Sequence, residues 1–119
     1  MRTIILALVL AAATIAPVTA APKGEQIFRL QCKGCHAADG TGMGPSLIGV
    51  FGAKIGARPN FAYSPALVQR QQDTWTEATL EAFLADPDPF APGTNMPKPQ
   101  GLLTATDLAA VIQYLATLK

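Results

Sequence analysis

The sequence predicts a small all-α protein with a single domain, and three features of the chain support this. Apolar residues recur at spacings of three and four in the segments 23–31, 74–84 and 104–119, as on one face of a helix. No segment shows the sustained apolar–polar alternation of a half-buried strand. The intervening segments are rich in glycine and proline, so we expect irregular loops between the helices.

The first residues have the pattern of a secretory signal peptide. A basic start, Met1-Arg2, precedes an almost wholly apolar stretch and then a small-residue cleavage region over residues 17–22. We expect cleavage after Ala20 or Ala21, which leaves one domain over residues 21–119 and places it in the periplasm. An uncleaved membrane anchor is the alternative, but a spanning helix needs about 20 apolar residues, and this run is shorter.

The balance of charges argues against nucleic-acid binding. The chain has nine Lys and Arg residues against eight Asp and Glu, and removal of Arg2 with the signal peptide makes the numbers equal. No basic run or basic helix face is present, so the sequence gives no indication of a nucleic-acid partner.

The first amphipathic segment, residues 23–31, leads directly into Cys32-Lys33-Gly34-Cys35-His36. This is the C-x-x-C-H pattern by which haem is attached covalently. In a helix both cysteines face one side, and His36 lies one turn beyond Cys32. The sulfurs can then form thioethers with the edge of one haem c while the imidazole binds the iron.

Other uses of the two cysteines remain open. A disulfide is common in exported chains and would give a colourless protein, although a redox-active C-x-x-C is expected after a buried strand rather than a helix. A zinc site would lack a fourth ligand, because the chain has two cysteines and one histidine.

A glycine-rich turn region over residues 40–45 suits a backbone that passes close to a bulky flat ligand. Ser64-Pro65 then has the pattern of an N-cap followed by proline and predicts a short helix over 64–72. A firmer helix is expected from Thr74, where Thr74-x-x-Glu77 fits a capping box, up to the prolines at 87 and 89.

The final helix is the clearest in the sequence. Residues 90–101 contain three prolines and two glycines, which exclude regular structure there. After this loop, apolar residues at helical spacing predict a helix that starts at Thr104 or Thr106 and runs to Lys119.

A haem iron held by His36 would need a second axial ligand, and the candidates are few. His36 is the only histidine, Met1 is removed with the signal peptide, and Met43 lies only seven residues after His36. Met96 is sixty residues beyond His36, in a loop stiffened by prolines, so it has ample length to reach the other face of the haem. A single methionine is also common as core filling or on the surface, so Met96 is a candidate on these grounds alone.

An ordered set of motifs extends over almost all of residues 21–119. It comprises Gly24 and Phe28 before the cysteines, then Gly44-Pro45-x-Leu47, Gly49-x-Phe51-Gly52, Phe61-x-Tyr63, the Trp75 to Leu84 helix, Pro92-Gly93-Thr94-x-Met96, and Tyr114-Leu115. With this set the chain resembles the class I cytochromes c, the group of the bacterial cytochromes c2 and mitochondrial cytochrome c. The resemblance implies the small cytochrome c fold, in which the N- and C-terminal helices cross and loops wrap one covalently bound haem.

The resemblance also implies a cofactor-binding set, which consists of Cys32, Cys35, His36, Pro45, Tyr63, Trp75 and Met96. The metal ligands would be His36 and Met96. The carbonyl of Pro45 would accept a hydrogen bond from the His36 ring and fix it, while Tyr63 and Trp75 would donate to a buried haem propionate.

The function that the resemblance implies is electron transport without catalysis. The chain would be a monomeric one-electron Fe(II)/Fe(III) shuttle from a quinol-oxidising complex or a dehydrogenase to an oxidase or photosynthetic centre. Its partners would be redox proteins that dock transiently at the exposed haem edge, with Lys33, Lys54 and Lys98 as candidate rim charges. It would meet the membrane only through such partner complexes.

Three departures from the family pattern bear on this. Phe83 stands where a tyrosine usually bonds near the methionine sulfur, Ala53 replaces a common arginine near the propionates, and Asn95 replaces a lysine. Fewer basic residues predict docking that depends less on charge steering. The missing hydroxyl favours an alternative function, a haem-based ligand sensor or weak peroxidase with a displaceable axial Met96.

Overall fold

The computed structural model describes residues 12–15, 21–101 and 104–119. Most of the predicted signal peptide lies outside these residues, so its cleavage stays a prediction. The elements of the described part are α1 (Lys23–Ile27), η1 (Phe28–Cys32), α2 (Pro65–Val68), α3 (Glu77–Ala85), α4 (Pro87–Phe90) and α5 (Ala105–Leu115). The only strand-like pairing in this part is a single bridge between Lys54 and Thr74, which confirms the all-α prediction.

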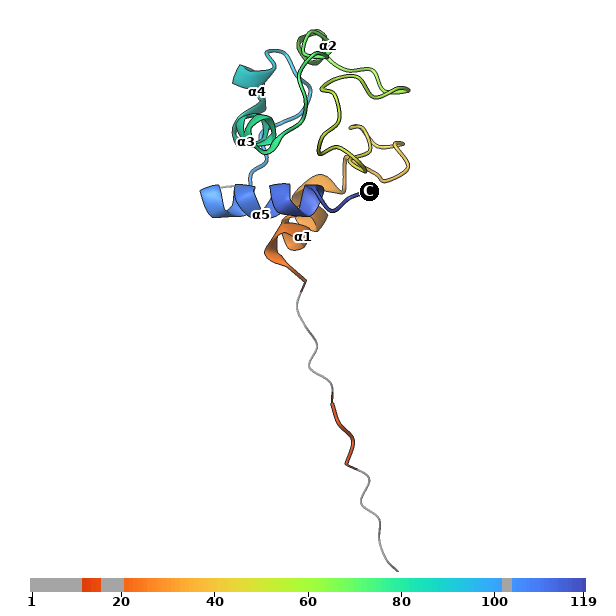
Figure 1. The fold of residues 1–119 in the computed structure, drawn as a ribbon, viewed down its shortest axis with the longest axis vertical. Helices are drawn as coiled ribbons and strands as arrows, with labels where there is room; N and C mark the ends of the chain where they lie inside the picture. The colour runs from red at the N-terminus through yellow and green to blue at the C-terminus, as the bar shows by residue number, and fades with distance from the viewer. Residues whose placement is uncertain (1–11, 16–20, 102–103) are drawn as a thin grey trace, which may run out of the picture.

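The N- and C-terminal helices α1 and α5 cross at the base of the molecule (Figure 1). Close approach requires glycine at position 24, because a Cβ there would lie 2.0 Å from the carbonyl oxygen of Ala110. Near this point the rings of Phe28 and Tyr114 pack with their centroids 5.2 Å apart, and Val111 is completely buried. The crossing therefore holds the helix that leads to Cys32.

The segment before the cysteines ends in a π-helical turn, η1, rather than in the α-helix expected over 23–31. The N–H of Lys33 donates to the carbonyl of Phe28, five residues earlier, over 2.9 Å. Because this wider turn rotates the following residues relative to α-helical spacing, Leu30 points outward and is 82 % exposed, while Cys32 is 8 % exposed. Leu30, one of the apolar residues at helical spacing in the predicted helix 23–31, therefore does not lie on its buried face.

The capping box of α3 begins two residues later than expected. The Thr76 hydroxyl accepts a hydrogen bond from the Thr79 N–H, and the Thr79 hydroxyl accepts one from the Thr76 N–H. Thr74 cannot serve as the cap because its backbone is paired with Lys54 in the isolated bridge. Glu77 is instead the first residue of the helix.

The other helix boundaries also differ from the sequence-based expectation. Helix α3 ends before Pro87 as expected, but Pro87 begins the further short helix α4, because proline is compatible with the first turn. Helix α2 is shorter than the predicted 64–72, and α5 ends at Leu115 rather than at Lys119. At its other end, the Thr104 side chain accepts from the Asp107 N–H over 3.0 Å, which makes Thr104 the N-cap.

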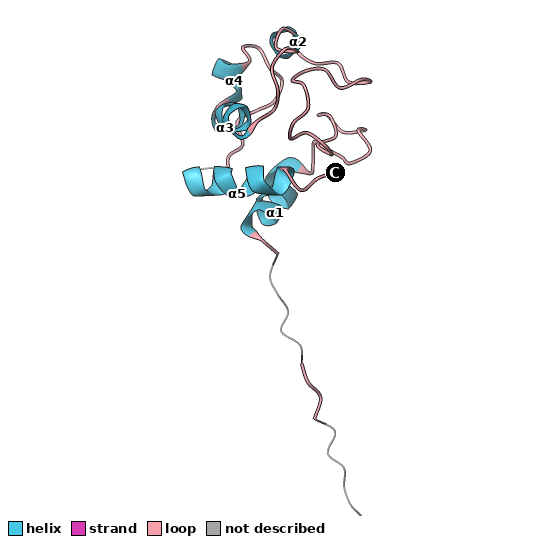
Figure 2. Cartoon of the chain, viewed as in Figure 1, coloured by secondary structure: helices cyan, strands magenta, loops and turns pink. Residues whose placement is uncertain are grey.

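The core is one cluster of buried apolar side chains between the helices and the loops. Figure 2 shows the helices α3, α4 and α5 on one side and the long loop of residues 33–64 on the other. The cluster comprises Ile27, Cys32, Val50, Ile55, Leu67, Trp75, Leu80, Phe83, Leu84, Ala91, Val111, Ile112 and Leu115. It thus includes the first cysteine of the motif. No helix in the described ranges is long and apolar enough to cross a membrane.

Candidate functional site

The two cysteines lie at the end of η1 and on the turn that follows it. The His36 N–H donates to the Cys32 carbonyl over 3.0 Å, so one helical turn continues through the motif. The thiols are not joined in a disulfide. Burial raises the pKa of the Cys32 thiol to about 11, whereas redox-active C-x-x-C thiols have lowered pKa values. The site therefore does not favour thiol–disulfide chemistry.

The His36 imidazole is held in a single orientation. Its Nδ1 lies 2.7 Å from the carbonyl oxygen of Pro45. Because a carbonyl can only accept, Nδ1 carries the proton and donates it, and Nε2 is left with a free lone pair for a metal. Gly44 packs directly against the ring, since a Cβ at this position would lie 2.5 Å from Cε1 of His36. The glycine-rich region thus closes over the imidazole itself.

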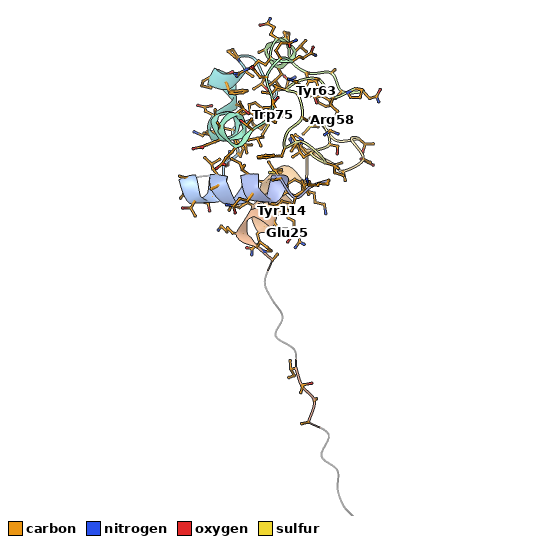
Figure 3. The ribbon with its side chains drawn as sticks, in the orientation of Figure 1. Glu25, Arg58, Tyr63, Trp75 and Tyr114 are labelled. Atoms are coloured by element: carbon orange, nitrogen blue, oxygen red, sulfur yellow. The ribbon has the colours of Figure 1, made fainter. Side chains whose placement is uncertain are left out.

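Tyr63 and Trp75, the two residues expected at a propionate, both contact the core cluster. Trp75 is 9 % exposed and belongs to the cluster, while Tyr63 is half-buried and packs against it. Burial raises the pKa of Tyr63, and the charge and hydrogen bonds of Arg58 oppose this rise. Figure 3 labels these three side chains in the upper part of the molecule, on the far side of α5 from Glu25.

Phe83 occupies an entirely apolar position. It is buried, with its ring centroid 5.2 Å from that of Trp75 and 5.5 Å from that of Phe90. The side chain thus completes an aromatic group with Trp75 and Phe90, whose rings stack with centroids 5.8 Å apart.

The two methionines in the described ranges have opposite surroundings. Met96 is half-buried and packs against the core cluster that contains Cys32. Its turn is fixed by a bond from the Met96 N–H to the Thr94 hydroxyl and by the left-handed backbone of Gly93, at a φ of 81°. Met43 is 83 % exposed. Of the two thioethers, only that of Met96 is directed to the interior.

The buried hydroxyl of Ser64 bears on whether the chain fits a haem. Its oxygen is buried and has no hydrogen-bond partner, and it makes no capping bond to α2 although Ser64 is the N-cap residue. A buried hydroxyl without a partner is costly. Because Ser64 follows Tyr63, a haem carboxylate beside Tyr63 would give this hydroxyl an acceptor. The free Nε2 of His36 and the two free thiols of Cys32 and Cys35 also fit a covalently bound haem.

Sequence inspection missed two residues near Tyr63. Ser64 has the pattern of a helix cap, which hides its buried and unpartnered oxygen. Arg58 lies in a loop without periodicity, so nothing in its neighbourhood distinguishes it from a surface arginine. In the ranges that the structure describes, no cluster of three or more His, Cys, Asp or Glu side chains is arranged to hold a metal, so the zinc alternative gains no support.

This combination defines a class of protein: a small all-α chain whose N-terminal helical segment leads into two free thiols, one of them buried in the core, and one oriented imidazole, as in c-type haem proteins. A family model described as "Cytochrome c" matches residues 21–119. The chain belongs to the cytochrome c family. It therefore carries haem c, attached covalently through Cys32 and Cys35, and it is a haem electron carrier.

Similar proteins cover most of the chain. Cytochrome c2 of Rhodomicrobium vannielii is 46 % identical over 98 residues, which are 80 % of this chain and 76 % of that protein. Cytochrome c2 iso-1 of Magnetospirillum molischianum is 45 % identical over 75 % of this chain and 91 % of its own length. In the solved structure of cytochrome cH from Methylobacterium extorquens, the matched part is 41 % identical, with a TM-score of 0.71, and covers 80 % of this chain and 95 % of that one.

Proposed function

We propose that this chain is a periplasmic, monomeric, single-haem electron carrier in which His36 and Met96 are the two axial ligands of the iron. The observation that carries this proposal is the orientation of His36, whose Nδ1 is 2.7 Å from the Pro45 carbonyl and whose Nε2 is free. The inward placement of Met96 against the core cluster supports the second ligand. Bound haem c supplies one-electron exchange between Fe(II) and Fe(III).

The residues of the site would keep its geometry the same in both oxidation states of the iron. The Pro45 carbonyl fixes the His36 ring and strengthens it as a donor. The thioether of Met96 is a soft ligand, which favours ferrous iron relative to a second imidazole. Tyr63 and Trp75 would hold a propionate by donating hydrogen bonds to it. With His36 and Met96 as its two ligands from the chain, the iron would have no position open for a substrate, so the protein would transfer electrons without catalysis.

Docking to redox partners would take place at the exposed haem edge. The partners are a quinol-oxidising complex or a dehydrogenase as donor and an oxidase or photosynthetic centre as acceptor. Lys33 and Lys98 are exposed, whereas the Lys54 ammonium donates to the Gln72 carbonyl over 3.1 Å and is partly committed to that bond. Because only two of these three lysines are unengaged, the rate of association with a redox partner should fall only weakly with ionic strength.

The proposal has two tests, one of transport and one of location. A potentiometric titration of the haem absorption band should follow a one-electron Nernst curve and reverse without hysteresis; a two-electron slope or an irreversible trace would contradict it. In a host that attaches haem to exported proteins, the periplasmic fraction should hold a chain that begins at Ala21 or Pro22. A periplasmic chain that keeps Met1 would contradict the predicted cleavage of the signal peptide.

A further inference from the structure

We propose that Arg58 is a positioning residue for the cofactor, whose guanidinium provides the positive charge that holds a haem propionate at the Tyr63 hydroxyl. This inference rests on the proposed function, because it takes Tyr63 to be a propionate donor. It adds a residue that lies outside the set of motifs by which the chain resembles its family, and it explains how the site works with Ala53 in place of an arginine.

The placement of Arg58 is the first support. The residue is half-buried in the loop before Tyr63, and its Nη2 donates to the carbonyl of Ile48. This bond ties the guanidinium to an earlier turn of the same long loop and limits its freedom to move. The charge and hydrogen bonds of Arg58 also lower the pKa of Tyr63 against the rise that burial causes, and Figure 3 labels both side chains in the upper part of the molecule. A guanidinium and a phenol in the same part of the fold are suited to one carboxylate, since both can donate to it.

The second support is the lack of a protein anion for this cation. The ion pairs in the part of the chain that the structure describes join Lys23 to Asp107, Arg29 to Glu25 and Arg70 to Asp73. Arg58 takes part in none of them.

Asp39 is the acidic residue that could be expected to pair with Arg58. It lines the same surface groove of about 460 Å³ as Arg58, but its carboxylate accepts from both the N–H and the hydroxyl of Thr41. It is therefore engaged within its own loop. The guanidinium of Arg58, which has no carboxylate partner among the described residues, is free to pair with an anion supplied from elsewhere. The residue after Tyr63, Ser64, has a buried hydroxyl without a hydrogen-bond partner, and an anion beside Tyr63 would also give this hydroxyl an acceptor.

The charge at this position predicts an effect on the reduction potential. Ferric iron carries one more positive charge than ferrous iron, so a nearby cation disfavours the ferric state and raises the potential. Removal of the Arg58 charge should therefore lower the potential, measured at mildly alkaline pH so that the propionate is ionised in every variant.

The test compares three variants of the holoprotein by potentiometric titration. Arg58→Gln removes the charge and keeps an N–H donor for the Ile48 carbonyl. Arg58→Lys keeps the charge. Arg29→Gln removes the same charge at an exposed site paired with Glu25 and serves as the control. We expect a lower potential in Arg58→Gln than in Arg29→Gln, and a return toward the wild-type value in Arg58→Lys.

Two results would overturn the proposal. One is a potential in Arg58→Gln equal to that of Arg29→Gln, which would leave Arg58 only the structural bond to Ile48. The other is an Arg58→Lys variant no closer to wild type than Arg58→Gln. If Arg58→Gln gives no folded holoprotein, Arg58→Ala against Arg29→Ala takes its place. A wild-type protein that lacks a c-type haem spectrum would mark failure of the proposed function instead, before any variant is compared.

Discussion

At the residue scale, the electron-carrier proposal depends most on Met96. In Met96→Ala the inward thioether is lost, so the ferrous iron should bind carbon monoxide and the reduction potential should fall, because a ligand that favours ferrous iron has been removed. Met43→Ala is the matched control, since its side chain is 83 % exposed; it should keep the wild-type spectrum and potential. Absorption spectra with and without carbon monoxide measure ligand binding in each variant, and a potentiometric titration of the haem band measures its reduction potential. Equal behaviour of the two variants would contradict ligation by Met96.

The partly buried hydroxyl of Tyr63 leads us to expect a loss of stability at alkaline pH. Burial raises its pKa above the ordinary value of 10.0, so the folded state holds the phenolic proton more tightly than the unfolded state. The resulting stability is present in full below pH 10.0 and is lost as the pH rises through the higher folded-state pKa. The difference in free energy of unfolding between wild type and Tyr63→Phe should thus shrink over this range in denaturant titrations. A difference that does not change with pH would show that the hydroxyl is not buried in the folded protein.

Single residues differ in how well the sequence predicts them. The C-x-x-C-H spacing is a local pattern, so Cys32, Cys35 and His36 can be assigned before any fold is known. Ser64 and Arg58 cannot, because a buried orphan hydroxyl or a guanidinium facing a tyrosine depends on which loops meet in space. Met96 lies between these cases: its loop is visible in the sequence, but its inward direction is a property of the packed core.

At the element scale, the start of α3 provides a direct comparison of two threonines. Thr76 makes the capping bond to the Thr79 N–H, so Thr76→Ala should lower the free energy of unfolding by about 0.5–2 kcal/mol. Thr74 lies just before the helix and makes no capping bond, and only its backbone is engaged; Thr74→Ala should cost less. Chemical denaturation of both variants tests this. A greater loss in Thr74→Ala would restore the capping box first expected from Thr74-x-x-Glu77.

The three longest helical segments were predictable from the sequence, whereas several of their ends were not. The apolar periodicity of residues 104–119 reflects burial against α1, a large and regular signal. The start of α3 depends instead on the bridge between Lys54 and Thr74, which joins segments twenty residues apart. The π turn at the end of the first helix is another such case, since its bond from Lys33 to Phe28 has no sequence signature.

At the scale of the whole molecule, four of the seven predicted site residues belong to one core or pack against it. Cys32 and Trp75 are part of the buried cluster, and Tyr63 and Met96 pack against it. The helix crossing at Gly24 and Ala110 fixes the end of the chain that carries the cysteines, and the loops bring the remaining groups to it. Such an arrangement can hold both axial ligands in place in both oxidation states, which is what a carrier without an open coordination position requires.

The visible absorption spectrum of the ferrous wild-type protein, recorded before and after addition of carbon monoxide, tests this central claim most directly. The protein should be produced where haem can be attached. We expect a c-type haem spectrum that carbon monoxide leaves unchanged, because we propose that His36 and Met96 are the two ligands that the chain gives to the iron. A spectrum that shifts on addition of carbon monoxide would contradict the closed carrier and favour a ligand sensor or weak peroxidase.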